Sequence, residues 1–121
     1  MSLEKNKAIV RKSIEAFNKK DLAVIDAMLD EFMALDFVDH STPVRGREKV
    51  KQSYKKWLKD FPDLHMTIED IIAEGDKVWY LEKDTGTASS GKKMDATSIN
   101  ILRIVNGKFV EGWGGYIQKT P

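Results

Sequence analysis

The residues best suited to chemistry are the adjacent pair Asp39 and His40. An unperturbed imidazole titrates at about pH 6.5, so His40 is a natural general acid or base at neutral pH. Neighbouring residues of a strand point to opposite faces, so only one of these two side chains can line a given cavity. A structural interpretation is also open, in which His40 bonds a backbone carbonyl near Pro43 and Asp39 caps the loop.

Aromatic side chains could surround a ligand near this pair. Tyr54 and Trp57 lie three residues apart on the sheet-facing side of a predicted helix. Their polar tips need partners when buried, and a cavity supplies partners more readily than a dry core does. Packing in an ordinary core explains the same spacing. Phe17 and either Trp79 or Tyr80 could complete the lining.

Polar residues on two predicted strands could also face a ligand. Asn100 stands among apolar neighbours, and Ser98 shares its face because side chains alternate along a strand. Ligand pockets are mostly apolar with a few placed polar groups, which favours a cavity here. The alternative is a buried amide that fixes the strand register. Tyr116 is expected to point inward as well, and Trp113 outward.

The composition limits the classes of protein that fit. The 121 residues suit one domain, 1–121, and 41% hydrophobic with 32% charged residues is typical of a globular chain. Basic residues number 20 and acidic residues 19, so we expect no nucleic-acid or membrane partner. The chain has no cysteine, and His40 and His65 lack a third ligand at useful spacing, so we expect no metal and no cofactor. No apolar signal region opens the chain, which favours a cytoplasmic protein.

Helical patterns come first and strand patterns follow. Apolar residues recur at helical spacing in residues 3–17, 22–32 and 47–61, with Asp21 as the predicted N-cap of the second helix. In these helices Leu3 and Leu22 are predicted to belong to the buried faces. Residues 37–40 form a short strand. Four strands follow from His65 onward, in two hairpins with turns at residues 74–77 and at Asn106-Gly107. This order predicts an α+β domain.

The strand at residues 97–105 is apolar on both faces. One face can pack against the helices, but the other needs a separate cover. A second copy of the chain is the simplest candidate. We therefore predict a homodimer that packs sheet against sheet.

Several segments together resemble the SnoaL-like polyketide cyclase and ester cyclase family. The resemblance covers nearly the whole chain and rests on residues 6–10, 18–22, 37–40, 61–64, 71–76 and 101–108. It implies a cone-shaped, curved antiparallel sheet packed on three N-terminal helices, of the cystatin-like or nuclear transport factor two-like type. Related domains include cofactor-independent cyclases and isomerases, hydrolases, and non-catalytic binders. The resemblance also places His40 inward.

The sequence departs from the family at positions that usually carry acid/base groups. A Glu-His-Trp-Asp-like segment is typical near the end of these cyclases, whereas Gly112 and Gly114 stand here in place of the His and the acid. Asn100 stands where an Asp is often found, and Ala88 where a His is often found. The two glycines predict an enlarged pocket beside Tyr116.

Two main functions are consistent with these features. The first is an enzyme acting on a hydrophobic carbonyl or ester compound, in which His40 moves the proton while Asn100 and a tyrosine hold the oxyanion. The second is a binding module for an apolar metabolite, because the expected acid/base positions are neutral. A dimeric scaffold with a filled cavity is a third alternative.

Overall fold

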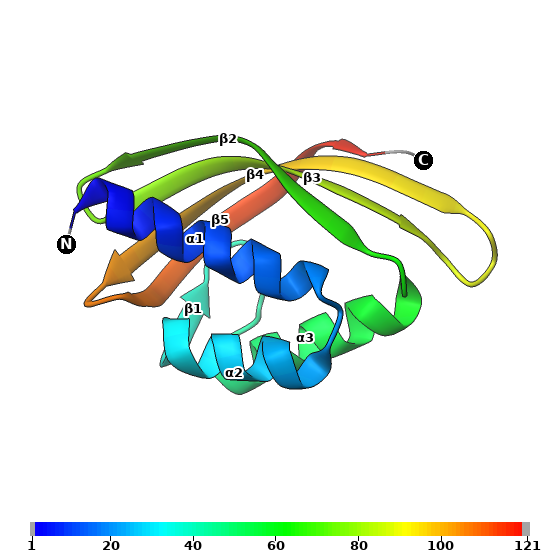
Figure 1. Ribbon diagram of the computed structural model, residues 1–121, viewed down its shortest axis with the longest axis horizontal. Coiled ribbons are helices and arrows are strands. Elements are labelled where there is room, and N and C mark those ends of the chain that lie inside the picture. Colours follow the sequence, from blue (N-terminus) through cyan, green and yellow to red (C-terminus); the bar gives the residue numbers. More distant parts are fainter. Residues whose placement is uncertain (1, 120–121) are drawn as a thin grey trace.

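The structure is a computed structural model, described here for residues 2–119. Three helices and five strands follow one another along the chain, and Figure 1 shows β2 to β5 arching over the helices. The elements in order are α1 Leu3–Asn18, α2 Leu22–Phe32, β1 Met33–Asp39, α3 Arg47–Asp60, β2 His65–Glu74, β3 Lys77–Thr87, β4 Lys93–Val105 and β5 Lys108–Lys119. The predicted α+β class is confirmed.

Helices α1 and α2 begin where a side chain satisfies free backbone amides. The Asp21 carboxylate accepts from the backbone N–H groups of Ala23 and Val24, as predicted for an N-cap. The apolar stripes of α1 and α2 then face the sheet. Leu3 and Leu22 are exceptions, because 42% and 39% of their surfaces are exposed. Each lies in the first turn of its helix, beyond the edge of the core, so their predicted burial was wrong.

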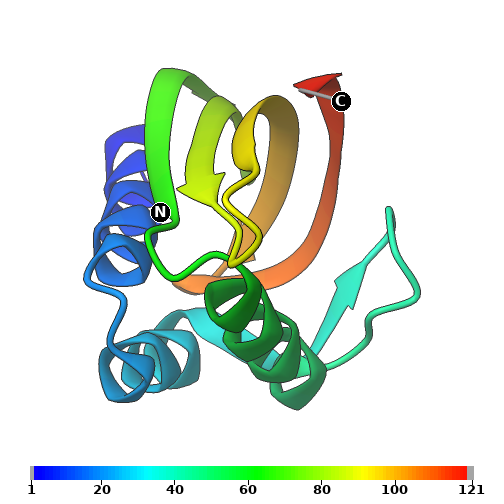
Figure 2. The same ribbon diagram turned by 90° about the vertical axis from the view of Figure 1, so that its right-hand side faces the viewer.

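The sheet has the strand order β1-β5-β4-β3-β2. Successive hairpins make β2 to β5 antiparallel, whereas β1 pairs with β5 in parallel. The sheet is therefore mixed. Helix α3 separates β1 from the hairpin strands along the chain, so β1 does not form a hairpin with its neighbour β5. Register shifts leave an extra residue on β2 against β3 and two on β5 against β4, and such irregularities bend strands. Figure 2 shows the sheet curling over the helical side.

The end of α1 is fastened to the edge of the sheet by one side chain. The Asn18 amide donates to the carbonyl of Met66 and accepts from its N–H, both at 2.8 Å. Asn18 thus takes the place of a neighbouring strand beside β2. Below it, the hydrophobic core fills the concave side of the sheet.

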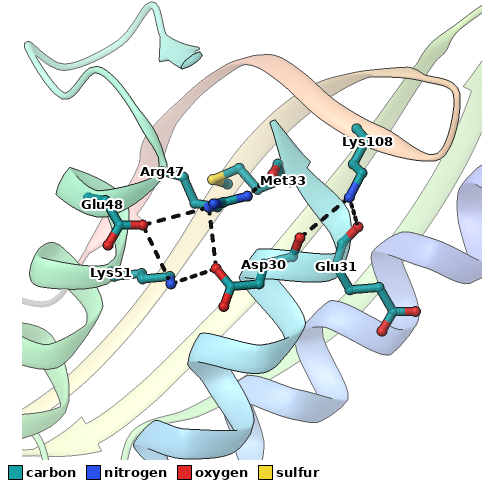
Figure 3. Close-up of polar contacts among 7 residues, drawn as sticks. All are labelled: Asp30, Glu31, Met33, Arg47, Glu48, Lys51 and Lys108. Atoms are coloured by element: carbon teal, nitrogen blue, oxygen red, sulfur yellow. Dashed lines mark hydrogen bonds and ion pairs between the residues drawn. The ribbon is translucent and has the colours of Figure 1, made fainter. Parts of the chain in front are cut away.

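An ion cluster joins the end of α2 to the start of α3 (Figure 3). Asp30 lies 2.6 Å from Lys51 and 3.3 Å from Arg47, and both bases also approach Glu48. Lys108 donates to the final carbonyls of α2, where a cation is favoured by the helix dipole. These contacts hold α2, α3 and the β4–β5 hairpin together below the sheet. Within residues 2–119, no helix combines the length and apolarity that a membrane span requires.

Candidate functional site

A cavity of about 440 Å³ lies between the concave face of the sheet and the helices. Apolar and aromatic side chains make up most of its wall. Polar groups come from strands β3 to β5, from the end of β1 and the segment after it, and from α1 and α3. The residues that line this cavity include Phe17, Phe37, Asp39, Tyr54, Trp57, Tyr80, Glu82, Asp84, Ser98, Asn100, Gly112, Gly114 and Tyr116.

Two buried carboxyl groups on β3 are the main chemical feature of this cavity. Glu82 and Asp84 are two residues apart, so both project from the same face of the strand. Only 8% of the Glu82 surface and 1% of the Asp84 surface are exposed. Within the described chain, no lysine, arginine or histidine lines the cavity or forms an ion pair with either carboxyl. The pair is therefore buried without a compensating cation.

Burial strongly disfavours the charged forms of these two groups. Burial, followed by the hydrogen bond and negative charge of Asp84, raises the pKa of Glu82 to about 9. Burial also raises the pKa of Asp84, although the hydrogen bond from Glu82 opposes that rise. The raised pKa keeps Glu82 protonated at neutral pH, and its carboxyl group is hydrogen-bonded to Asp84.

Three tyrosines surround the carboxyl pair and keep their hydroxyl protons. Burial raises the pKa of Tyr54, Tyr80 and Tyr116, and the negative charges of Glu82 and Asp84 add to the rise. Tyr54 also stacks on Phe17 with ring centroids 4.0 Å apart. All three hydroxyls are thus potential hydrogen-bond donors to a ligand.

Strand pairing sets the polar groups in two rows across the sheet. Tyr80 lies opposite Asn100, while Glu82 lies opposite Ser98, which in turn lies opposite Tyr116. The Asn100 amide donates to the Ser98 hydroxyl at 2.9 Å. A ligand oxygen above these rows would meet several donors at once, next to the carboxyl pair.

Six of the eight predicted site residues line this cavity. They are Phe17, Tyr54, Trp57, Ser98, Asn100 and Tyr116. Tyr80 also faces inward, so the Trp79 ring, predicted as a lining candidate, lies on the opposite face of β3. Strand alternation allows only one of these two aromatic rings to face in.

The predicted inward orientation of His40 was wrong. Asp39 lines the cavity, whereas the His40 imidazole lies 2.7 Å from the Glu111 carboxylate and stacks on Trp113. Asp39 is held inward because its carboxylate accepts from the Ser41 N–H and the Thr42 hydroxyl. This agrees with the interpretation of Asp39 as a loop cap. The His40 side chain contacts Glu111 and not the backbone carbonyl near Pro43 that the structural interpretation suggested.

Comparison with known proteins places the chain in a family. Residues 7–118 match the model of SnoaL-like polyketide cyclases. The chain belongs to the SnoaL-like polyketide cyclase family, as the sequence motifs indicated. No curated protein matches it.

Solved structures of similar proteins share the fold over nearly the whole chain. AclR from Streptomyces galilaeus, provisionally assigned as a hydroxylase, is 27% identical with a TM-score of 0.81, over 95% of this chain and 76% of AclR. IdmH from Streptomyces antibioticus, provisionally assigned as a polyketide cyclase, is 26% identical with a TM-score of 0.80, over 93% of this chain and 91% of IdmH.

The glycines that replace the typical acid/base residues of SnoaL-like cyclases do not leave empty space. A Cβ on Gly114 would lie 2.5 Å from the Asn100 side-chain oxygen. A Cβ on Gly112 would lie 3.0 Å from Leu102 and 3.1 Å from the Phe37 ring. The prediction of an enlarged pocket beside Tyr116 was therefore wrong, because neighbouring side chains occupy the volume.

Glu82 and Asp84 were missed by reasoning from sequence. The sequence feature that could have identified them is the alternation of residues 78–86, which places Tyr80 on the same face of the strand as both carboxyl groups. Acidic residues in a strand normally indicate a solvated face.

The structure shows no conventional metal site, because the described residues contain no cluster of three or more His, Cys, Asp or Glu ligands.

Replacing Gly114 by alanine tests the packing of Asn100. The new methyl group would overlap the Asn100 amide and displace it, so we expect a loss of roughly 1–3 kcal/mol in the free energy of unfolding. Gly115→Ala is a matched control, because no atom lies within 4 Å of its added Cβ. Urea denaturation of both variants makes the comparison. Equal losses would contradict the proposed packing.

The carboxyl pair also predicts how stability varies with pH. The pKa of Glu82 rises from 4.5 to about 9 on folding, so the folded chain holds a proton that the unfolded chain releases. The stabilising contribution of Glu82 is complete below about pH 4.5 and is lost as pH rises towards 9, by at most about 1.4 kcal/mol per pH unit. Urea denaturation between pH 5.5 and 8.5 should show this decline for the wild type.

Glu82→Gln should flatten that decline, because glutamine has no proton to release in this range. Glu69→Gln, at an exposed position of β2, is the control and should leave the slope unchanged. A wild-type stability independent of pH over this range would exclude the proton held by Glu82.

Proposed function

We propose that this SnoaL-like protein is an acid/base enzyme that acts on a hydrophobic carbonyl compound in the cavity. The observation that carries the proposal is the buried Glu82–Asp84 pair, which holds a proton at neutral pH inside an aromatic pocket. Functional carboxyl groups often have pKa values displaced in this way. The pair replaces His40, whose ring contacts Glu111 and Trp113 instead.

The proposed reaction is proton transfer at the carbon next to a carbonyl group. A Glu82 carboxyl oxygen takes that proton while the proton already on Glu82 passes to Asp84. The electron pair left on carbon delocalises onto the carbonyl oxygen, which a tyrosine hydroxyl or the Asn100 amide stabilises by donating a hydrogen bond. This donor role of Asn100 keeps the oxyanion function predicted for it.

The next reaction of the enolate then determines the product. In an isomerisation, the pair returns the proton to a different carbon of the same compound. In a cyclisation, the enolate carbon forms a bond to a second carbonyl carbon, and the resulting alkoxide takes the proton back from the pair. Atoms and charge balance in both cases, because the proton that leaves the substrate passes to the carboxyl pair and is returned from it.

Exchange of carbon-bound protons with deuterated water tests this chemistry without knowledge of the natural substrate. The probe is 2-tetralone, a hydrophobic ketone, observed by NMR in D₂O. Wild-type protein should accelerate exchange at the carbons beside the carbonyl, and Glu82→Gln and Asp84→Asn should each reduce the acceleration by about 10² or more. His40→Ala is the control and should retain it.

Two results would contradict the acid/base role. Acceleration that survives in both carboxyl variants would place the chemistry elsewhere. Stabilisation of the protein by 2-tetralone without any exchange in the wild type would instead favour the binding module, in which the pocket holds an apolar metabolite unchanged. Circular dichroism of each variant separates loss of chemistry from loss of fold.

We further propose a homodimer formed through the outer face of the sheet. Ile72, Trp79, Ile101 and Trp113 lie side by side on this face, one from each of four neighbouring strands. Ile72 is 61% exposed and Trp79 is 39% exposed, and such apolar rows are typical of interaction surfaces.

Substitution of Trp79 tests the dimer. Trp79→Lys should shift the sedimentation coefficient from that of a dimer to that of a monomer at micromolar concentration, because it places a charge in the centre of the apolar row. Leu35→Lys changes an apolar residue that is 65% exposed on β1, away from the row, and should leave the dimer intact. A monomeric wild type would refute this assembly.

A further inference from the structure

Helix α3 has an unusual concentration of positive charge. Six of its 14 residues are basic and two are acidic, although the whole chain carries a net charge of only +1. The remaining chain is therefore acidic on balance. A charge separated in this way creates a local field that the net charge conceals.

The two ends of α3 use their basic residues differently. At the N-terminal end, Arg47 and Lys51 are neutralised by Asp30 and Glu48, as Figure 3 shows. At the C-terminal end, Lys56 pairs with Asp60, at 3.2 Å. Lys55 and Lys59 form no ion pair among the described residues, and both are exposed.

Lys55 and Lys59 border a shallow hollow between α3 and the turn that joins α1 to α2. Four lysines, one glutamine and three apolar residues line it, and no acidic residue does. They are Lys20, Leu22, Gln52, Lys55, Lys56, Leu58, Lys59 and Pro62. The hollow thus combines an apolar floor with a basic rim.

The lysines of this hollow repel one another, and a partner of opposite charge would relieve that repulsion. Lys55 and Lys59 are like charges at i and i+4, an arrangement that destabilises a helix. Leu22 exposes 39% of its surface beside these charges.

We propose that this hollow docks an acidic amphipathic helix of another protein. Glutamate or aspartate side chains of that helix would lie against Lys20, Lys55 and Lys59, and an apolar side chain would cover Leu22 and Leu58. Binding of an amphipathic helix in a groove with apolar contacts and charged flanks is a recurring mode of recognition. Complementary charge would mainly increase the rate of association.

The residue types favour a protein over a nucleic acid or a membrane. The rim contains lysines but no arginine, whose planar guanidinium is preferred for phosphate. The hollow has no aromatic ring on which a base could stack. Its apolar part is confined to Leu22, Leu58 and Pro62, unlike the broad apolar face by which helices lie on membranes.

This docking surface is independent of the proposed chemistry. The cavity takes Tyr54 and Trp57 from one side of α3, whereas the hollow takes Lys55 and Lys59 from the other. A docked partner would therefore lie one helix away from the cavity without entering it. Loss of docking would leave ketone exchange unaffected, so the two proposals can fail separately.

The test measures binding of a fluorescein-labelled, acidic amphipathic 20-residue peptide built from Glu, Leu and Ala, by anisotropy at low and physiological salt. The double variant Lys55→Glu and Lys59→Glu should weaken binding about tenfold or more. The matched control, Lys92→Glu with Lys93→Glu in and beside the β3–β4 loop, changes the net charge equally and should alter affinity less than twofold.

Three results would overturn the proposal. Equal weakening by both double variants would indicate general charge attraction. Undiminished binding of the same peptide with Gln in place of Glu would remove the role of charge. Tighter binding of a dT20 oligonucleotide or of phosphatidylglycerol vesicles than of the peptide would assign the surface to nucleic acid or membrane. Circular dichroism confirms that both double variants fold.

Discussion

The proton that Glu82 holds beside Asp84 is the constraint on which the site depends. Two ionised carboxylates cannot remain adjacent in an apolar cavity, since each loses hydration and each repels the other. Retaining one proton reduces that cost and supplies a hydrogen bond. Burial, with a smaller contribution from these negative charges, raises the pKa of nearby tyrosines and keeps their hydroxyls protonated. One electrostatic arrangement thus provides both a proton carrier and hydrogen-bond donors.

The glycines of β5 stand where the family resemblance predicts acid/base groups, and neighbouring side chains pack close to both of them. Gly112 admits the Phe37 ring, and Gly114 admits the Asn100 amide. Side chains at these two positions would displace the wall that now closes the cavity. The β5 side of this pocket is therefore specialised for close packing, and the titratable groups face it from β3.

Helix α3 connects the cavity with the rest of the molecule. Its inner side supplies Tyr54 and Trp57, while its first turns are held to α2 through Asp30. That ion cluster pairs Arg47 and Lys51, whereas Lys55 and Lys59 in the C-terminal half form no ion pair among the described residues and are exposed. One helix thereby combines a wall of the cavity, a structural ion cluster and a charged surface.

The sequence by itself determined the element order, the α+β class and the family, because these follow from local periodicity, turn residues and motif spacing. It also identified Phe17, Tyr54, Trp57, Ser98, Asn100 and Tyr116 correctly as cavity residues. Tertiary structure alone decided that Asp39 faces inward rather than His40, since that depends on how β1 pairs with β5. Burial of Glu82 and Asp84 likewise required three dimensions. Nothing local distinguishes an acidic strand residue facing water from one facing a closed cavity, because the difference lies in which helices cover that face.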